Sequence, residues 1–334
     1  MINLYKIMFF NLTLLGTFIT ISSISWYTMW LGLEINLLAV IPLLIKENNY
    51  SKEAAMKYFL AQAFASSLII FAVVTSDSFF ELNLSSLKNQ IILNSALLMK
   101  MGAAPFHFWF PEVVSGLSWP SIFLLSTWQK IAPMIMISFL TNSPILMTFA
   151  IISSSVISGV QGLNQTSTRK IMAYSSINHT GWLISTFLSS LDIWIIYMLI
   201  YSFILLSTVY FFNKFNIFWM QQLNFIYSDK KNTKLIIFLN FLSLGGLPPF
   251  MGFFPKWLAI MMMLKSNFFF TCIILIISTL LTLFFYVRLT FFSMTNKTME
   301  NILIIIKHMS YPAILLNLFL LLSLVMYMIF YSIF

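Results

Sequence analysis

Long apolar runs separated by short polar segments dominate the pattern of this chain. A helix needs about 20 apolar residues to cross the hydrocarbon of a membrane, and about eleven runs reach that length. They cover approximately residues 4–23, 26–45, 56–75, 91–112, 119–140, 144–162, 169–190, 193–212, 234–264, 268–291 and 310–333. A membrane barrel would show short alternating strands instead. The pattern therefore predicts an all-α polytopic membrane protein of about eleven transmembrane helices.

The composition agrees with a lipid environment and excludes several kinds of site. Hydrophobic residues make up 60% of the chain and charged residues only 8%, too few to cover the surface of a soluble domain. The single cysteine, Cys272, excludes an intrachain disulfide, a cysteine zinc site and a cysteine-bound iron–sulfur cluster. No phosphate-binding glycine loop or Ser/His/Asp set is evident. The abundance of Phe, Met, Ile, Asn and Ser is typical of an AT-rich organellar gene.

The basic residues predict how the chain is oriented. With eleven spans, thirteen of the 18 basic residues fall on the N-terminal face and two, Lys88 and Lys265, on the other. The thirteen are Lys6, Lys46, Lys52, Lys57, Arg169, Lys170, Lys214, Lys230, Lys231, Lys234, Arg288, Lys297 and Lys307. Positive charge gathers on the inner face of membranes, so the N-terminus is expected in the matrix or cytoplasm and the C-terminus on the opposite side.

Four ionisable residues fall inside predicted spans: Glu34, Lys100, Lys130 and Lys256. A charge at the centre of an inserted helix costs about 2.5–3.5 kcal/mol. Snorkelling or a structural ion pair would explain one such residue near a helix end. These four lie about 8–10 residues from the less positive face, or ~12–15 Å deep, in a line parallel to the membrane.

Proton transfer is the chemistry that best suits this set. A lysine removed from water can lose and regain a proton near neutral pH. At an effective dielectric near 20, charges about 4 Å apart interact by about 4 kcal/mol. Pairing and separation of Glu34 and Lys100 could therefore drive a proton to the next lysine.

Two segments of the chain repeat one another. Residues 102–112 (GAAPFHFWFPE) align without gaps on residues 246–256 (GLPPFMGFFPK), with five identities and a charge at the last position of each. An offset of five helices inverts the second copy, and inverted repeats with broken helices are typical of secondary transporters. Chance similarity between two apolar segments is the alternative. The run 234–264 is also too long for one straight span.

Prolines and glycines predict where the two helices break. Pro105 and Pro133 cannot donate the helical hydrogen bonds to Met101 and Gln129, beside Lys100 and Lys130, although kinks also occur for packing alone. The predicted helix-break prolines are Pro105, Pro111, Pro248, Pro249 and Pro255. We expect one transmembrane domain over 1–334, with helices 1–75 first, a repeat at about 91–212 and its inverted copy at about 234–334.

Two histidines are secondary relay candidates. His179 lies midway along its predicted span, and His107 lies in the first broken segment. Histidine titrates near neutral pH, so either could pass protons. A buried, hydrogen-bonded histidine with a packing role is the alternative for each. No metal site is expected.

Five motifs resemble those of the antiporter-like subunits of respiratory complex I. They are GLEINLLAVIPL (32–43), KMGAAPFHFWFPEV (100–113), TWQKIAP (127–133), TRKIMAYSSINHTGW (168–182) and GGLPPFMGFFPKW (245–257). The resemblance implies a fold of fourteen helices with two inverted five-helix repeats, shortened by the first three helices in the mitochondrially encoded animal form. It also implies that Glu34 and Lys100 form an ion pair, that Lys130 is the central proton carrier and that Lys256 lies towards the outlet.

The resemblance further implies a place in a larger assembly. The expected partners are complex I chains 4, 4L and 6, accessory subunits and membrane lipids, including bound phospholipid, in the mitochondrial inner membrane; no nucleic acid is expected. Flavin and iron–sulfur clusters would belong to other subunits, as would NADH oxidation and ubiquinone reduction. A stand-alone cation/proton antiporter, a purely structural subunit and a quinone-binding enzyme are the alternatives.

Overall fold

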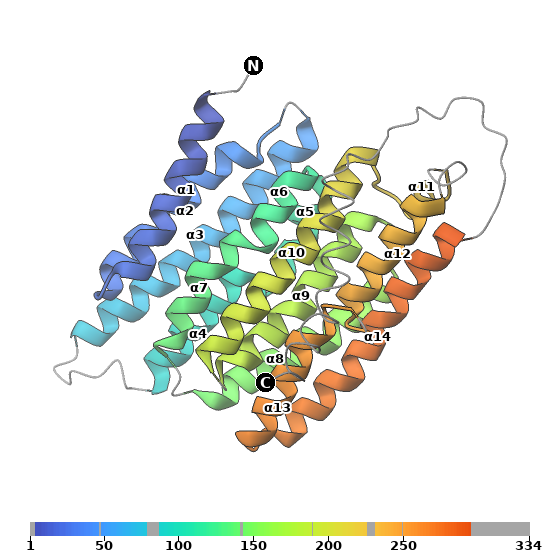
Figure 1. Ribbon diagram of the computed structural model, residues 1–334. Helices are drawn as coiled ribbons and strands as arrows, with labels where there is room; N and C mark the ends of the chain where they lie inside the picture. The colour runs from blue at the N-terminus through green and yellow to red at the C-terminus, as the bar shows by residue number, and fades with distance from the viewer. Residues whose placement is uncertain are drawn as a thin grey trace, which may run out of the picture. The chain divides into compact units, whose positions relative to one another are not determined.

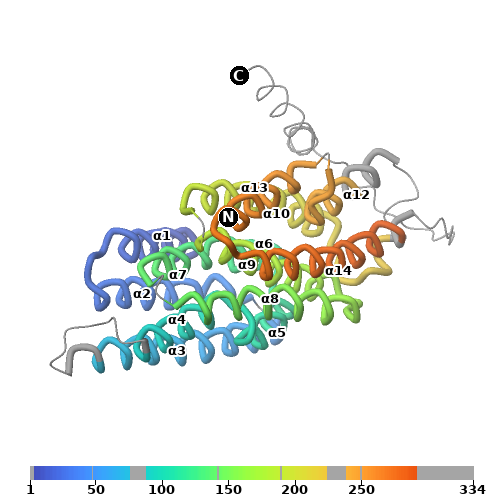
Figure 2. Tube along the Cα trace, turned by 90° about the horizontal axis from the view of Figure 1, so that it is seen from below, coloured from blue at the N-terminus to red at the C-terminus, as the bar shows by residue number. Residues whose placement is uncertain are grey.

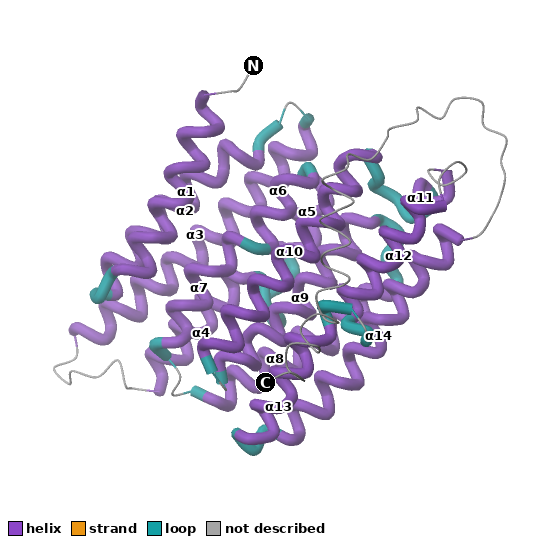
Figure 3. The backbone as a smooth tube through the Cα atoms, viewed as in Figure 1, coloured by secondary structure: helices purple, strands orange, loops and turns teal. Residues whose placement is uncertain are grey.

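The computed structural model describes residues 4–46, 48–78, 87–140, 143–188, 190–225, 231–248 and 250–294. Within these ranges the regular structure is helical, with one isolated β-bridge between Ser167 and Trp219 and no strand (Figure 3). The predicted all-helical class is therefore confirmed for the described part. The predicted span 310–333 lies outside it.

The chain divides into two compact units, Met1–Ser154 and Ser155–Phe334, each considered by itself. The helices of the first unit are α1 (Leu4–Ser22), α2 (Trp26–Leu44), α3 (Asn49–Ser78), α4 (Leu87–Met101), α5 (Trp109–Gly116), α6 (Trp119–Ser126), α7 (Trp128–Ser138) and the first half of α8 (Pro144–Leu163) (Figure 1). The second unit holds the rest of α8 with α9 (Thr168–Phe187), α10 (Leu191–Phe215), α11 (Gln222–Phe225), α12 (Lys231–Gly245), α13 (Phe253–Lys265) and α14 (Phe269–Met294).

Small residues allow α1 and α2 to pack closely in the first unit. A Cβ atom at Gly16 would lie 2.9 Å from the backbone oxygen of Gly32 and 2.9 Å from the backbone nitrogen of Asn36. Glycine at such crossings lets two helix backbones approach where any side chain would separate them. Next to this hairpin, α3 packs on α2, α4 and α5, while α7 packs on α1, α4 and α6 (Figure 2). The helix α2 is thereby held against α3, and Asn36 connects it to α7 through hydrogen bonds with Gln129.

The second unit is built around α9, whose side chains are buried along almost its whole length. It contacts α10, α13 and α14, and α12 packs on α10 and α14. A helix buried on all sides must satisfy its polar side chains internally. Accordingly, the hydroxyls of Ser175, Ser176 and Thr180 bond back to carbonyls one turn earlier.

Six of the described helices are long and apolar enough to cross a membrane. They are Leu4–Ser22, Trp26–Leu44, Asn49–Thr75, Pro144–Leu163, Leu191–Phe215 and Phe269–Phe291. The predicted runs 4–23, 26–45, 144–162 and 268–291 agree with their helices to within a few residues. The multi-pass prediction is thus supported, and the count of eleven spans stays a prediction.

The predicted run 119–140 differs from the structure, which divides it at Thr127 into α6 and α7. Thr127 has φ −115° and ψ −73°, outside helical values. The hydroxyls of Ser126 and Thr127 bond back to the carbonyls of Ile122 and Phe123, each at 2.7 Å, and such bonds bend helices. The length of an apolar run does not reveal such local hydrogen bonds, so the sequence predicted one continuous helix.

The two repeated segments share one local conformation. In each, a helix ends immediately before a glycine with positive φ: α4 before Gly102 (φ 68°) and α12 before Gly246 (φ 77°). A second helix begins seven residues after each glycine. Pro111 and Pro255 are the third residues of α5 and α13, where a missing N–H breaks no helical bond. Pro105 and Pro248 lie in the intervening segments, and Pro249 lies outside the described residues. That each helix pair forms one broken, inverted span stays a prediction.

Candidate functional site

Lys100 lies in the last turn of α4 and is only 5% exposed. Because α4 ends at Met101, its own helix does not cap the carbonyl of Lys100. Instead, Nε2 of Gln62 in α3 donates a hydrogen bond to that carbonyl at 3.1 Å.

A small cavity opens beside Lys100. Its volume is about 10 Å³, roughly the space that one water molecule needs. The lining residues are Leu33, Asn36, Leu37, Tyr58, Gln62, Lys100, Gln129 and Pro133. They come from α2, α3, α4 and α7, so this cavity joins the helix that carries Glu34 to the helix that carries Lys130.

Glu34 lies on α2 and is half-buried. Its carboxylate interacts electrostatically with Lys100, but the ion pairs found among the described residues do not include a direct one between these two groups. Its Oε1 atom is enclosed by protein and accepts no hydrogen bond from the described residues. The structure therefore brings the two charges into one neighbourhood without direct contact.

Lys130 lies in α7, just after the interruption at Thr127, and is 1% exposed. Its Nζ lies 5.3 Å from the centre of the Phe110 ring, which is itself buried in α5. An ammonium group over an aromatic face gains about 2 kcal/mol when both are desolvated. Phe110 therefore supplies part of the stabilisation that water would otherwise give a charged Lys130.

A pair of reciprocal hydrogen bonds joins Asn36 of α2 to Gln129 of α7. Asn36 Nδ2 donates to Gln129 Oε1 at 2.9 Å, and Gln129 Nε2 donates to Asn36 Oδ1 at 3.1 Å. Both side chains are buried, at 4% and 9% exposure. This pair links α2 to the residue directly before Lys130.

Lys256 belongs to the second unit, lies in the first turn of α13 and is buried. Its Nζ donates a 2.8 Å hydrogen bond to the carbonyl of Gly245, the last residue of α12. A Cβ atom on Gly246 would lie 2.8 Å from the Lys256 Cδ atom, so glycine leaves room for this side chain. The Lys256 amine thus binds a carbonyl at the C-terminal end of a short helix.

Both candidate histidines are buried and hydrogen-bonded. His179 Nδ1 lies 3.0 Å from the Tyr197 hydroxyl, and its ring lies 4.6 Å from that of Tyr201. His107 Nδ1 lies 3.3 Å from the carbonyl of Pro105, within the segment between α4 and α5. This hydrogen bond of His107 stays within its own segment, whereas the hydrogen bond of His179 connects α9 to α10.

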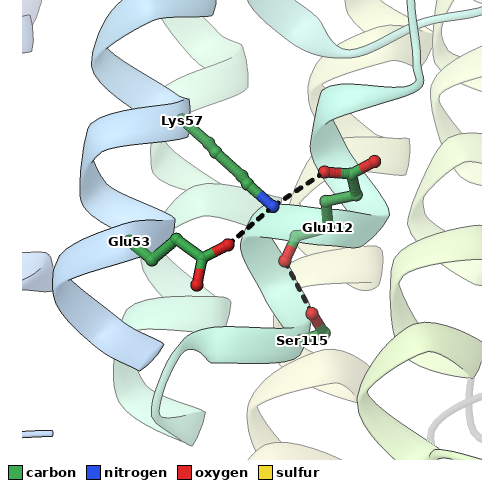
Figure 4. Close-up of polar contacts among 4 residues, drawn as sticks. All are labelled: Glu53, Lys57, Glu112 and Ser115. Atoms are coloured by element: carbon green, nitrogen blue, oxygen red, sulfur yellow. Dashed lines mark hydrogen bonds and ion pairs between the residues drawn. The ribbon is translucent and has the colours of Figure 1, made fainter. Parts of the chain in front are cut away.

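The last positions of the two repeated segments differ in environment. Glu112 is exposed and forms an ion pair with Lys57 of α3 at 3.0 Å (Figure 4). Lys57 also forms an ion pair with Glu53 at 3.0 Å. The three side chains are 42–63% exposed, so water screens these pairs and each contributes less than about 1 kcal/mol. At the matching position, Lys256 is buried. The buried charge next to the first segment is Lys100, which precedes it by two residues, whereas Glu112 is exposed.

Sequence reasoning missed the neutral members of this site. Gln62, Asn36 and Gln129 carry no charge, and Phe110 looks like any other apolar residue. A signal was present for the three amides, because each interrupts an apolar run and needs a partner once buried. Phe110 offered no such signal, since only the fold brings its ring to Lys130.

Comparison with known proteins assigns the chain to a family. The model of the NADH:quinone oxidoreductase/Mrp antiporter transmembrane family matches residues 23–282. The chain belongs to this family. The resemblance drawn above from five motifs is thereby confirmed, and the match includes all four ionisable residues of the predicted relay.

Curated relatives carry the family assignment, and solved structures show the shared fold. NADH-ubiquinone oxidoreductase chain 2 of Anopheles gambiae is 46% identical over 289 residues, covering 85% of this chain and 84% of the relative. The chain 2 of Locusta migratoria is 37% identical over 302 residues, covering 90% and 88%. A chain of respiratory complex I from Thermus thermophilus has a TM-score of 0.79 at 21% identity, covering 96% of this chain and 78% of that one. A chain of an archaeal membrane-bound sulfane sulfur reductase scores 0.82 at 16% identity, covering 97% and 73%. The two structures support the fold, and the relatives support membership among antiporter-like subunits.

Proposed function

We propose that this chain is a membrane-arm subunit of proton-pumping NADH:ubiquinone oxidoreductase and that it moves protons through Glu34, Lys100, Lys130 and Lys256. The observation that carries the proposal is the burial of three lysines beside helix ends and interruptions, in a family whose named relatives belong to that enzyme. NADH oxidation and ubiquinone reduction occur in other subunits and drive the transfer.

The surroundings of each lysine suit a group that changes its protonation state. Gly245 holds the Lys256 amine through a backbone carbonyl, and the neutral amine can still donate a hydrogen bond to it. Lys100 has a carboxylate, Glu34, near enough to interact with it but not locked to it. A small movement that pairs Glu34 with Lys100 would hold a proton there, and separation would release it towards Lys130.

The proposal includes a cellular setting. The chain would lie in the mitochondrial inner membrane with its N-terminus in the matrix and its C-terminus in the intermembrane space. It would contain eleven spans, two of them broken at the repeated segments, and would contact complex I chains 4, 4L and 6. Flavin and iron–sulfur clusters would be held by other subunits, and this chain would bind phospholipid at its apolar surface.

The test is the proton-to-electron ratio of the assembled enzyme carrying Lys130→Met. Methionine keeps the length and apolar stem of lysine but cannot carry a proton, so we expect a lower ratio or a loss of coupled turnover. Lys57→Met is the matched control, because Lys57 is exposed and its ion pairs are screened. An unchanged ratio with Lys130→Met at full NADH oxidation would show that the chain is a structural subunit.

A further inference from the structure

The Asn36–Gln129 pair lies beside one candidate proton carrier, Lys100, and directly precedes another, Lys130, in the sequence of α7. Both residues line the cavity that also contains Lys100, and Gln129 precedes Lys130 in α7. Each amide uses one N–H and its carbonyl oxygen for the other. A carboxamide has two N–H donors and two acceptor positions on its oxygen. Each side chain therefore retains one N–H donor and one acceptor position for another partner.

A packing role alone would explain less of this arrangement. Hydrogen bonds between membrane helices contribute on average about 0.6 kcal/mol, a small gain for two buried amides. Two apolar side chains of similar volume would join α2 to α7 without the cost of desolvating polar groups. The observation that packing leaves unexplained is that the pair opens onto a water-sized polar cavity beside Lys100.

We infer that Asn36 and Gln129 are positioning residues that hold a hydrogen-bonded path between Lys100 and Lys130. This inference rests on the proposed function. The pair fixes α7 against α2, and the remaining N–H and acceptor positions order a water molecule in the cavity. A proton leaves the Lys100 ammonium through that water and arrives at a neutral Lys130 amine, and the amides gain no net charge.

The chain provides variants that separate positioning from packing. Gln129→Met removes both hydrogen bonds at similar size, and Gln129→Asn is milder because it only shortens the side chain by one methylene. Adding Asn36→Gln to Gln129→Asn restores both amides and the summed length of the pair. The control is Asn94→Leu, because Asn94 is a buried amide of the same unit that bonds Ser143 Oγ at 2.6 Å away from this cavity.

The measurement is the proton-to-electron ratio of the assembled, NADH-oxidising enzyme. We expect Gln129→Met to lower the ratio as far as Lys130→Met does and Gln129→Asn to lower it less. The Asn36→Gln/Gln129→Asn double variant should restore the ratio, and Asn94→Leu should reduce only the amount of assembled enzyme. If Gln129→Asn keeps the full ratio, or if Asn94→Leu lowers it equally, the inference is wrong. An unchanged ratio with Lys130→Met would instead remove the proposed function itself, so the two failures are distinguishable.

Discussion

At the scale of single residues, two of the buried lysines lie beside the C-terminal end of a helix, and one of them, Lys256, contacts a backbone carbonyl there. Lys256 donates to the carbonyl of Gly245, and Lys100 lies in the last turn of a helix that ends at the following residue. The unsatisfied carbonyls at a helix C-terminus carry about half an elementary negative charge. At Lys256, such a partial charge attracts an ammonium group less strongly than a full carboxylate would.

Gly246 provides a sharp test of this arrangement. Gly246→Ala would place a Cβ atom 2.8 Å from Lys256 Cδ and force alanine into a positive φ of 77°, which costs about 1–3 kcal/mol. We expect the Lys256 amine to lose its contact with Gly245, and both the proton-to-electron ratio and the thermal stability of the assembled enzyme to fall.

The neighbouring glycine is the control for that substitution. A Cβ atom on Gly245 would have its nearest neighbours at 3.7 Å, an ordinary contact, so Gly245→Ala should leave both measurements unchanged. Equal losses from the two substitutions would contradict the account, because they would show a general sensitivity of the segment rather than a need for space beside Lys256.

The charged residues of the site could be predicted from sequence, and its neutral residues could not. Glu34, Lys100, Lys130 and Lys256 were predictable because a charge within an apolar run is costly wherever it lies. The partners that surround them depend on which helices meet. No local pattern predicts that Gln62 of α3 reaches the carbonyl of Lys100 or that Phe110 of α5 covers Lys130.

At the scale of elements, one arginine ties the end of α8 to α14. Arg288 donates to the carbonyl of Leu163 at 2.5 Å and to that of Gln165 at 2.9 Å, so one guanidinium satisfies carbonyls at the end of α8 and in the connection to α9. Hydrogen bonds from a charged donor contribute about 1.5–3 kcal/mol. The side chain therefore anchors the connection that leads into α9, the buried centre of the second unit.

Arg288→Met should loosen this connection while leaving the helices intact. We expect faster hydrogen exchange at the backbone amides of residues 164–168, by about one to two orders of magnitude if the full interaction is lost. Arg288→Lys is the informative companion, since an ammonium group lacks the planar fork that reaches two carbonyls and should protect only in part. If Arg288→Met exchanges at the same rate as the unaltered protein, Arg288 does not stabilise the connection. The backbone hydrogen bonds of Thr168 and Met220 would then hold the connection without it.

Helix positions were predictable where run length alone decides them. The run 268–291 matches α14 closely because a long apolar stretch has no competing local structure. The prediction for 119–140 was incomplete because Ser126 and Thr127 turn their hydroxyls onto their own helix, which hydropathy cannot detect. The positive-φ glycines after α4 and α12 were visible in sequence only through the repeat.

At the scale of the whole molecule, the repeat and the charges support one another. Two segments with the same helix–glycine–helix conformation each place a buried lysine at a helix end, although the lysine precedes the glycine in one and follows it in the other. An inverted pair of such segments would present equivalent sites to opposite sides of a membrane. The inversion and the shared depth of the four residues stay predictions.

The assembly state decides between the proposed function and a stand-alone antiporter. The apolar faces of α1, α10 and α14 carry many exposed large side chains, which lipid or neighbouring subunits must cover. After solubilisation of the native membrane in mild detergent, we expect the chain to migrate in a very large complex with NADH dehydrogenase activity. Omitting NADH from the activity stain controls for unrelated staining.

A small particle without that activity would contradict the subunit assignment. Family membership would then leave the antiporter as the better account, because a four-residue relay with no redox partner can exchange ions but has no source of energy to pump them.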